Sequence, residues 1–282
     1  MSRARIALLT LLALVAFAGN SLLCRAALAQ TGIDAASFTL VRLLSGAVVL
    51  GLLAWLRPGG TRSRGNWPSA LALFAYAAAF SFAYLQLTAA AGALLLFGAV
   101  QATMIAHGLW SGERLRPLQL GGLVLACGGL VGLVLPGLSA PPLAAALLMM
   151  TAGIAWGVYS LRGRGAGDPL QVTAGNFLRA VPMAAVLALL LFRQASPDAA
   201  GLGYAVLSGA LASGVGYAIW YSALPLLTSV TAATVQLAVP VIAALGGVFL
   251  LGEPLTLRLL AASVAILGGV ALVVMTGAKR TQ

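Results

Sequence analysis

Acidic side chains are almost absent from this chain, which has five Asp or Glu residues and one histidine among 282 residues. The carboxylates all fall at the ends of long apolar stretches or between them: Asp34, Glu113, Asp168, Asp198 and Glu253. Enzyme and metal sites need such groups within reach of one another. No apolar stretch holds paired acids, a His/Cys cluster or a Ser-His-acid set, so we predict no enzyme activity, no metal site and no cofactor.

Cysteine is equally scarce, since Cys24 and Cys127 stand alone inside apolar stretches. Isolated thiols there are best read as small hydrophobic residues, which excludes a disulfide framework. Only 7% of residues are charged and 61% are hydrophobic, with a mean hydropathy of +1.04. Soluble domains carry about 25% charged residues. We therefore expect a membrane protein surrounded by lipid. The net charge of +11 does not indicate nucleic-acid binding, because no basic patch has interleaved aromatic residues.

Ten apolar stretches are long enough for helices that cross a bilayer, which need roughly 20 residues. They cover residues 6–27, 33–56, 67–87, 89–110, 117–136, 142–160, 170–192, 199–222, 226–251 and 257–277. Most prolines fall at the breaks, where they end helices, whereas Pro182 and Pro240 lie inside stretches. The sequence predicts an all-α polytopic membrane protein of ten transmembrane helices.

Lysine and arginine indicate the orientation. With a cytoplasmic N-terminus, eleven of the 16 basic residues fall on the cytoplasmic side, three on the other side and two within helices. The positive-inside rule thus places both termini in the cytoplasm, in a bacterial-type inner membrane. Ala27-Leu28-Ala29 also ends a stretch that has the outline of a cleavable signal peptide. We expect this stretch to be retained, because it corresponds to 142–160 in the second half of the chain.

An internal repeat divides the chain. Residues 112–135 align without gaps with 252–275, and eight of the 24 pairs are identical. Arg42 and Arg179 lie 137 residues apart, as do Tyr84 and Tyr221. We predict a first repeat over 1–137 and a second over 138–282. Because each repeat has five helices, the second is inserted upside down, which is the inverted architecture of many secondary transporters. This predicts a central cavity that alternates between the two sides of the membrane.

Two sets of short motifs repeat between the halves. The first half has Ala18-Gly19-Asn20, Phe38-Thr39-Leu40-Val41-Arg42 and Gly112-Glu113-Arg114-Leu115. The second has Ala155-Trp156-Gly157, Phe177-Leu178-Arg179 and Gly252-Glu253-Pro254-Leu255, with Pro240 before the last. In this pattern the chain resembles the drug/metabolite transporter superfamily, specifically the ten-helix EamA-type permeases, and is similar to bacterial aromatic amino-acid exporters. The resemblance implies metabolite export, with helices one, three, four, six, eight and nine lining the cavity.

Charged residues inside the predicted helices are candidates for function. Arg42 and Arg179 are the two charges well inside the bilayer. A charge is costly there, so each arginine is expected to have a structural or functional role. Their equivalent positions suit a shared architectural role, and binding of a substrate carboxylate is the alternative. His107 is a candidate for proton coupling, because its unperturbed pKa lies near neutrality. It also lies near the cytoplasmic end of its helix, and an interfacial position is favoured because a proton relay normally needs further ionisable partners in the membrane.

Aromatic and amide side chains are the better candidates for substrate binding. Tyr76, Phe80 and Tyr84 share one helix face at a spacing of four. The predicted substrate-binding set is Asn20, Tyr76, Phe80, Tyr84, Gln101, Trp156, Tyr159, Tyr217 and Gln236. An apolar pocket with a few polar groups suits a small amphiphile. We therefore expect an exporter of neutral or aromatic amino acids or related metabolites. Transport of an anionic phosphorylated metabolite through Arg42 and Arg179, or multidrug efflux, remains the alternative.

Overall fold

The computed structural model describes residues 3–57, 65–112, 116–135, 137, 140–163, 167–223 and 235–277. Within these ranges the chain is all-helical, as predicted, with eight long apolar helices and two shorter ones, ten in total. They are α1 (Arg3–Gln30), α2 (Ala35–Leu56), α3 (Trp67–Tyr84), α4 (Ala89–Trp110), α5 (Pro117–Val134), α6 (Leu143–Gly163), α7 (Pro169–Leu190), a continuous eighth helix made of α8 (Ala199–Leu207), η2 (Ser208–Val215) and α9 (Gly216–Ala223), α11 (Ala238–Leu251) and α12 (Leu257–Gly277). A short 3₁₀ turn, η1 (Phe192–Gln194), follows α7. The start of the predicted ninth helix lies outside the described residues.

Local sequence signals set the helix starts. The Asp34 carboxylate accepts hydrogen bonds from the backbone N–H groups of Ala36 and Ser37 and so caps α2. It also accepts one from Ser196 N, before α8. Burial would raise the Asp34 pKa, but the bonds from Ser37, Ser196 and Ala36 outweigh it and hold the pKa below its usual value. The Asp34 carboxylate therefore links the segment between α1 and α2 to the segment before α8.

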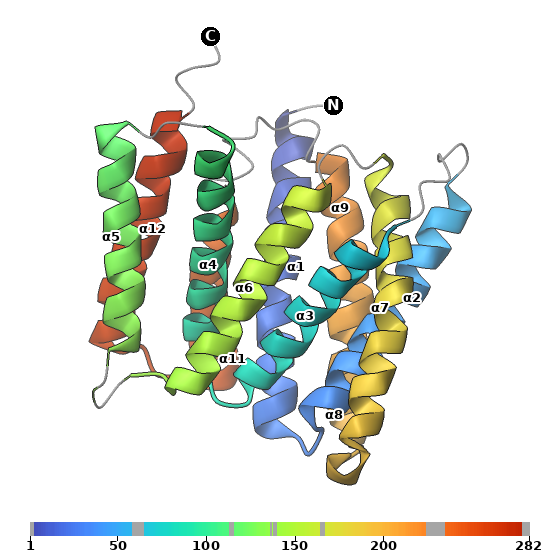
Figure 1. Cartoon of the computed structure of the whole chain (residues 1–282). Coiled ribbons are helices and arrows are strands. Elements are labelled where there is room, and N and C mark those ends of the chain that lie inside the picture. The colour runs from blue at the N-terminus through green and yellow to red at the C-terminus, as the bar shows by residue number, and fades with distance from the viewer. Residues whose placement is uncertain are drawn as a thin grey trace.

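The packing of the helices shows the predicted repeat. The helices α2 and α7, α4 and α11, and α5 and α12 each pack on their own counterpart in the other half. In addition, α3 packs on α6 as the eighth helix packs on α1. Exchanging the two halves therefore reproduces these contacts, as a two-fold pseudo-symmetry requires. Figure 1 shows α1 and α6 running in opposite directions through the bundle, and the start of α1 at the same end as the end of α12. The repeats are thus inverted.

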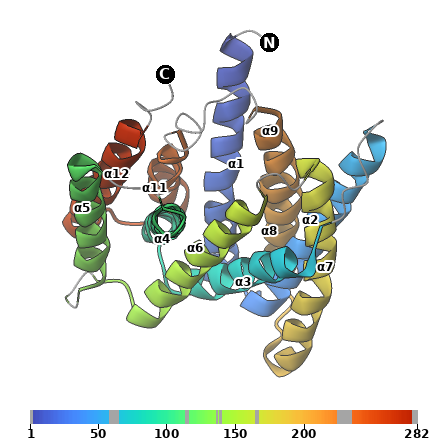
Figure 2. The ribbon, with the colours of Figure 1, turned by 45° about the horizontal axis from the view of Figure 1, so that its top comes forward.

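Glycines allow close helix contacts between the repeats. On α5, a Cβ added at Gly122 would lie 2.6 Å from the backbone oxygen of Gly269 on α12. Gly153 and Gly157 on α6 face α4 equally closely. By contrast, a Cβ at Gly128 would meet nothing within 4 Å. Small residues are the usual means by which membrane helices approach one another. Figure 2 shows the α5–α12 pair at one edge of the bundle and α2 with α7 at the other.

The outer surface of the bundle matches a lipid environment. Large apolar side chains are exposed along most helices, among them Val48, Phe249 and Val264. Trp55 and Trp110 are also exposed, near the ends of α2 and α4 that lie on the side of the termini. Tryptophan is enriched where the hydrocarbon meets the headgroups. Some of the buried polar and aromatic side chains, among them Asn20, Arg42 and Tyr76, lie together inside the bundle.

Candidate functional site

A central cavity of about 420 Å³, including its mouth, lies between the two repeats. The twelve lining residues come from helices one, three, four, six and eight and from the start of the ninth: Phe17, Asn20, Ser21, Tyr76, Phe80, Leu96, Phe97, Trp156, Ala212, Ser213, Tyr217 and Gln236. These are the six helices that the family resemblance implies.

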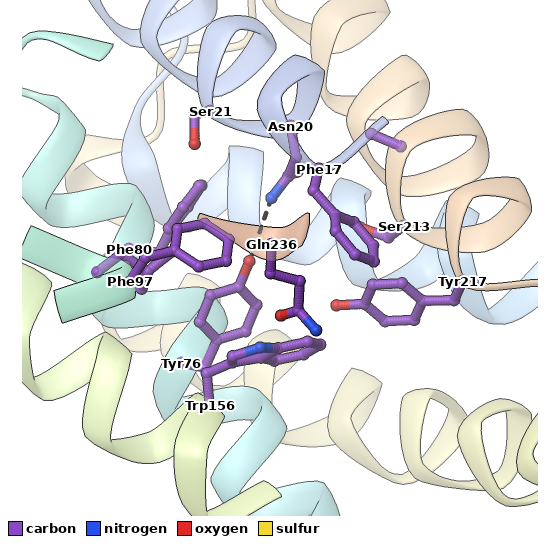
Figure 3. A pocket seen from close by; sticks show the side chains of 12 residues that line it. Phe17, Asn20, Ser21, Tyr76, Phe80, Phe97, Trp156, Ser213, Tyr217 and Gln236 are labelled. Atoms are coloured by element: carbon purple, nitrogen blue, oxygen red, sulfur yellow. Dashed lines mark hydrogen bonds between the residues drawn. The ribbon is translucent and has the colours of Figure 1, made fainter. Parts of the chain in front are cut away.

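Aromatic rings form the walls of this cavity (Figure 3). The centroid of the Trp156 ring lies 4.9 Å from that of Tyr76 and 5.4 Å from that of Tyr217. Phe17 meets Tyr217 edge to face at 5.9 Å, and Tyr76 contacts Phe80 at 5.4 Å. Ring pairs at such distances stabilise each other beyond the burial of their area. The walls therefore present mainly ring surfaces to the cavity.

A chain of buried hydrogen bonds runs through one side of the cavity. Ser208 Oγ, in η2, donates to Asn20 Oδ1 at 2.7 Å, and Asn20 Nδ2 donates to the Tyr76 hydroxyl at 3.1 Å. Arg42 Nη2 donates to the same hydroxyl at 2.9 Å. The chain connects the eighth helix, α1, α3 and α2. Four helices from both repeats are thus fixed around Tyr76.

The π-helix η2 gives Ser208 its position. A π-helix takes five residues rather than four between hydrogen-bonded groups, and such turns are frequent at functional sites. Here Gly209 follows Ser208 and faces α2 so closely that a Cβ would collide with the backbone oxygen of Arg42 and with Ser45 Oγ. The prediction of a regular eighth helix did not include this turn. Its two sides supply Ser208 to the hydrogen-bond chain and Ser213 to the cavity wall.

The two intramembrane arginines have different surroundings despite their equivalent positions. The Arg42 residue is 2% exposed, and its guanidinium carbon lies 5.2 Å from the Tyr76 ring centroid and 4.8 Å from that of Phe80. Arg179 is only partly buried, and its Nη1 donates to Gly175 O on its own helix at 2.8 Å. Arg42 therefore stands at the centre of the molecule, directly behind the cavity wall, whereas Arg179 stands away from it.

Six of the nine residues predicted to bind substrate line the cavity, and three do not. Tyr84 is fully buried against Gly92, below the cavity on α3. Tyr159 stacks on Trp156 at 5.4 Å, behind that ring. Gln101 is buried on α4, one turn beyond the lining residue Phe97. A role of these three residues in substrate binding stays a prediction.

The sequence also left lining residues unidentified. Phe17 lies three positions before Asn20 on α1, and Ser213 lies four positions before Tyr217 on the eighth helix. Residues at these spacings share a helix face. Extending each predicted residue by one turn would have found both. His107 is exposed in the last turn of α4, in keeping with an interfacial position, and the side chain of Tyr221 lies outside the part of the chain that the structure describes.

With the site in view, comparison with known proteins defines the family. A sequence model of the EamA-like transporter family matches residues 4–135 and again 143–275. This chain belongs to the EamA-like transporter family. It is 62% identical over 270 residues to the uncharacterized protein PA1977 of Pseudomonas aeruginosa, in an alignment that covers 95% of this chain and 94% of that protein. A protein of known crystal structure, 20% identical, superposes with a TM-score of 0.69 over 99% of this chain and 100% of its own.

This EamA-like transporter carries an ion-pair network at the end of the bundle opposite its termini. Arg25 Nε on α1 donates to Glu253 Oε1 at 2.9 Å, and Arg25 Nη1 donates to Tyr84 O at 3.0 Å. The other Glu253 oxygen accepts from Ala89 N, at the start of α4, at 2.8 Å. One arginine and one glutamate therefore hold α1, α3, α4 and the end of α11 together. We call these two residues the Arg25–Glu253 clamp.

The opposite end of this EamA-like transporter is held differently. Arg162, which is 137 residues after Arg25 and so its repeat counterpart, donates to Ser69 Oγ at 3.1 Å and to Asn66 Oδ1 at 3.4 Å. Asn66 N in turn donates to the buried Asn176 Oδ1 at 2.9 Å. Glu113, the counterpart of Glu253, lies outside the described residues. Equivalent arginines thus join α1 to α3 and α11 at one end, and α6 to α3 at the other.

Proposed function

We propose that this membrane transporter exports neutral or aromatic amino acids, or related small amphiphiles, across the inner membrane by alternating access. Both termini then lie in the cytoplasm. The observation that carries the proposal is the central cavity, which both repeats line and which aromatic rings enclose. A site on the pseudo-symmetry axis of inverted repeats is the arrangement from which alternating access arises.

The chemistry of the lining supports small amphiphiles as substrates. Phe17, Phe80, Trp156 and Tyr217 offer apolar contact, and Gln236 reaches in beside Trp156 (Figure 3). An apolar pocket with a few placed polar groups recognises a ligand of that kind. A phosphate dianion needs several cationic or N–H donors. Arg179, which a phosphate site would use together with Arg42, bonds to its own helix. The geometry therefore favours amino acids over phosphorylated metabolites.

The two ends of the bundle support alternating access. The Arg25–Glu253 clamp joins helices from both repeats at one end, and Arg162 joins both repeats at the other. Each contact must break for its end to open, so the two ends can open in turn.

Flux into proteoliposomes tests the proposal. We expect saturable uptake of labelled phenylalanine that accelerates when unlabelled phenylalanine is present on the opposite side, since counterflow is a property of a carrier. Trp156→Ala removes the central ring and should lower the flux several-fold at equal protein content. A neutral control is Val264→Ala, because that side chain is exposed on the outer surface of α12. Absence of flux for phenylalanine and for other amphiphiles would refute the proposal, and flux that never saturates would indicate a channel.

A further inference from the structure

We infer that the side of the cavity formed by Tyr76 and Arg42 is a subsite for one carboxylate, and that among the small amphiphiles of the proposed function the transporter prefers those with a single net negative charge. The inference rests on the proposed function, because it assigns the substrate class of the same cavity. The subsite consists of the Tyr76 hydroxyl, as the group that contacts the carboxylate, and the Arg42 guanidinium behind it.

The first support is an uncompensated charge. No described carboxylate lies within ion-pair distance of Arg42, and its Nε and Nη1 are buried without a hydrogen-bond partner among the described residues. A guanidinium stays protonated in proteins. A buried charge without a counter-ion is expensive, and a buried arginine is normally paired. With two of its nitrogens unbonded and no counter-ion in the described part of the chain, Arg42 favours a negative charge bound close by.

The second support is position. Tyr76 and Phe80, whose rings lie beside the guanidinium, both line the cavity. One ring layer therefore separates the charge from the space that a substrate occupies. In surroundings of low polarity such a charge is felt across that layer far more than it would be in water.

The third support comes from counting donors and acceptors at Tyr76. Its hydroxyl oxygen accepts one hydrogen bond from Arg42 Nη2 and one from Asn20 Nδ2. In the structure Asn20 Oδ1 accepts from Ser208 Oγ, so Nδ2 is the end of the amide that faces Tyr76. A phenol has two lone pairs and one proton. Both lone pairs are used, so the Tyr76 proton remains for a ligand, and the positive charge of Arg42 makes it a stronger donor. It suits a carboxylate oxygen better than a donor such as an ammonium group.

The charge of the preferred substrate follows from what the cavity lacks. None of the twelve lining residues is acidic, and residues 224–234, which precede the described start of the ninth helix, contain no Asp or Glu. An ammonium group would thus find aromatic faces and amides, but no counter-ion. We expect 3-phenylpropionate to bind more tightly than phenylalanine, and 2-phenylethylamine to bind least. Phenyl phosphate, with two negative charges against one guanidinium, should bind less tightly than 3-phenylpropionate.

The experiment compares these four compounds, which share a phenyl ring and differ in charge. Binding to the purified full-length protein in detergent is measured by the shift in unfolding temperature, and transport is measured by flux into proteoliposomes. Arg42→Gln removes the charge and Tyr76→Phe removes only the hydroxyl. Arg179→Gln is the matched control, since it removes the equivalent charge of the other repeat away from the cavity. Size-exclusion profiles establish whether each variant is folded. If Arg42→Gln does not fold, Tyr76→Phe is used to test the subsite in its place.

The inference predicts at least a tenfold preference in dissociation constant for 3-phenylpropionate over 2-phenylethylamine, which Arg42→Gln abolishes, Tyr76→Phe reduces and Arg179→Gln leaves unchanged. Equal binding of the two compounds, tightest binding of phenyl phosphate, or a preference that survives both cavity variants would overturn it. If binding shows the expected preference and no compound is transported, the carboxylate subsite stands and the proposed function fails. If the compounds are transported without charge preference, the proposed function stands and the subsite fails. Absence of both binding preference and transport would refute both.

Discussion

Replacement of Arg42 by glutamine is the change that tests the site most directly. A carboxylate oxygen bonded to the Tyr76 hydroxyl lies about 2.7 Å from the phenol oxygen, which itself is 2.9 Å from Arg42 Nη2. The carboxylate oxygen and Arg42 Nη2 are then about 5.6 Å apart, which we take as the separation of the opposite charges. At an effective dielectric constant of about 20 they attract by about 3 kcal/mol, whereas in bulk water the figure is about 0.7 kcal/mol.

The size of the change in KM shows whether the Arg42 charge attracts the substrate carboxylate strongly or is screened by solvent. Since about 1.4 kcal/mol corresponds to a factor of ten, Arg42→Gln should raise the KM for 3-phenylpropionate by up to roughly 150-fold. Complete screening would leave a change of about 3.5-fold. The assay is concentration-dependent flux in proteoliposomes with equal amounts of folded protein, and 2-phenylethylamine is the internal control because its KM should fall or stay unchanged. A rise of about threefold or less, or an equal rise for both compounds, would refute the reasoning.

Three further predictions concern the frame of the transporter. Arg25→Gln breaks the clamp, so a membrane-impermeant maleimide should label Cys24 faster, by up to roughly fivefold for a partly exposed ion pair worth about 1 kcal/mol; labelling unchanged or slower would contradict the role of the clamp. Gly122→Ala forces α5 from α12 and should cost about 1–3 kcal/mol in thermal unfolding in detergent, whereas Gly128→Ala, which meets nothing, should be neutral, and equal effects would be inconsistent with the packing. The lowered Asp34 pKa adds stability above the unfolded-state pKa of about 3.9, which is lost as the pH falls through the folded-state value. The difference in melting temperature between wild type and Asp34→Asn should therefore be complete at about pH 7 and shrink below about pH 4, and a pH-independent difference would disprove the linkage.

The helices were predictable because the bilayer imposes a length and a composition on each of them. The expected fourth helix over 89–110 is α4 to the residue, and Pro117 begins α5 as a proline at the first position of a helix does. The inverted relation also followed from the sequence, since five helices per repeat leave no other orientation. Six of the cavity-lining residues were also predictable, because they are aromatic or amide side chains on the helices that the resemblance implies.

The remainder depended on tertiary contacts that no local pattern encodes. Arg42 and Arg179 occupy the same place in the repeat, yet only Arg42 faces a partner such as Tyr76, because the side chains that surround the two arginines differ. The π-helical turn at 208–215 arises where Gly209 meets the backbone of α2, a contact of residues far apart in the chain. Tyr84 follows the spacing of Tyr76 and Phe80 but lies two turns from the first of them, beyond the end of the cavity. Sequence periodicity predicts which face of a helix a residue occupies, but not its height along the helix relative to the cavity.

The pairing of each helix with its own counterpart has a consequence for biosynthesis. Helices α2, α4 and α5 find their principal or symmetry-related partners, α7, α11 and α12, only in the second half of the chain. During synthesis the first five helices therefore enter the bilayer before those partners exist. Until then, surfaces such as the Gly122 side of α5 are exposed to lipid. Assembly is completed when the last helix arrives, so loss of α12 should expose the whole α5 interface to quality control rather than remove one peripheral helix.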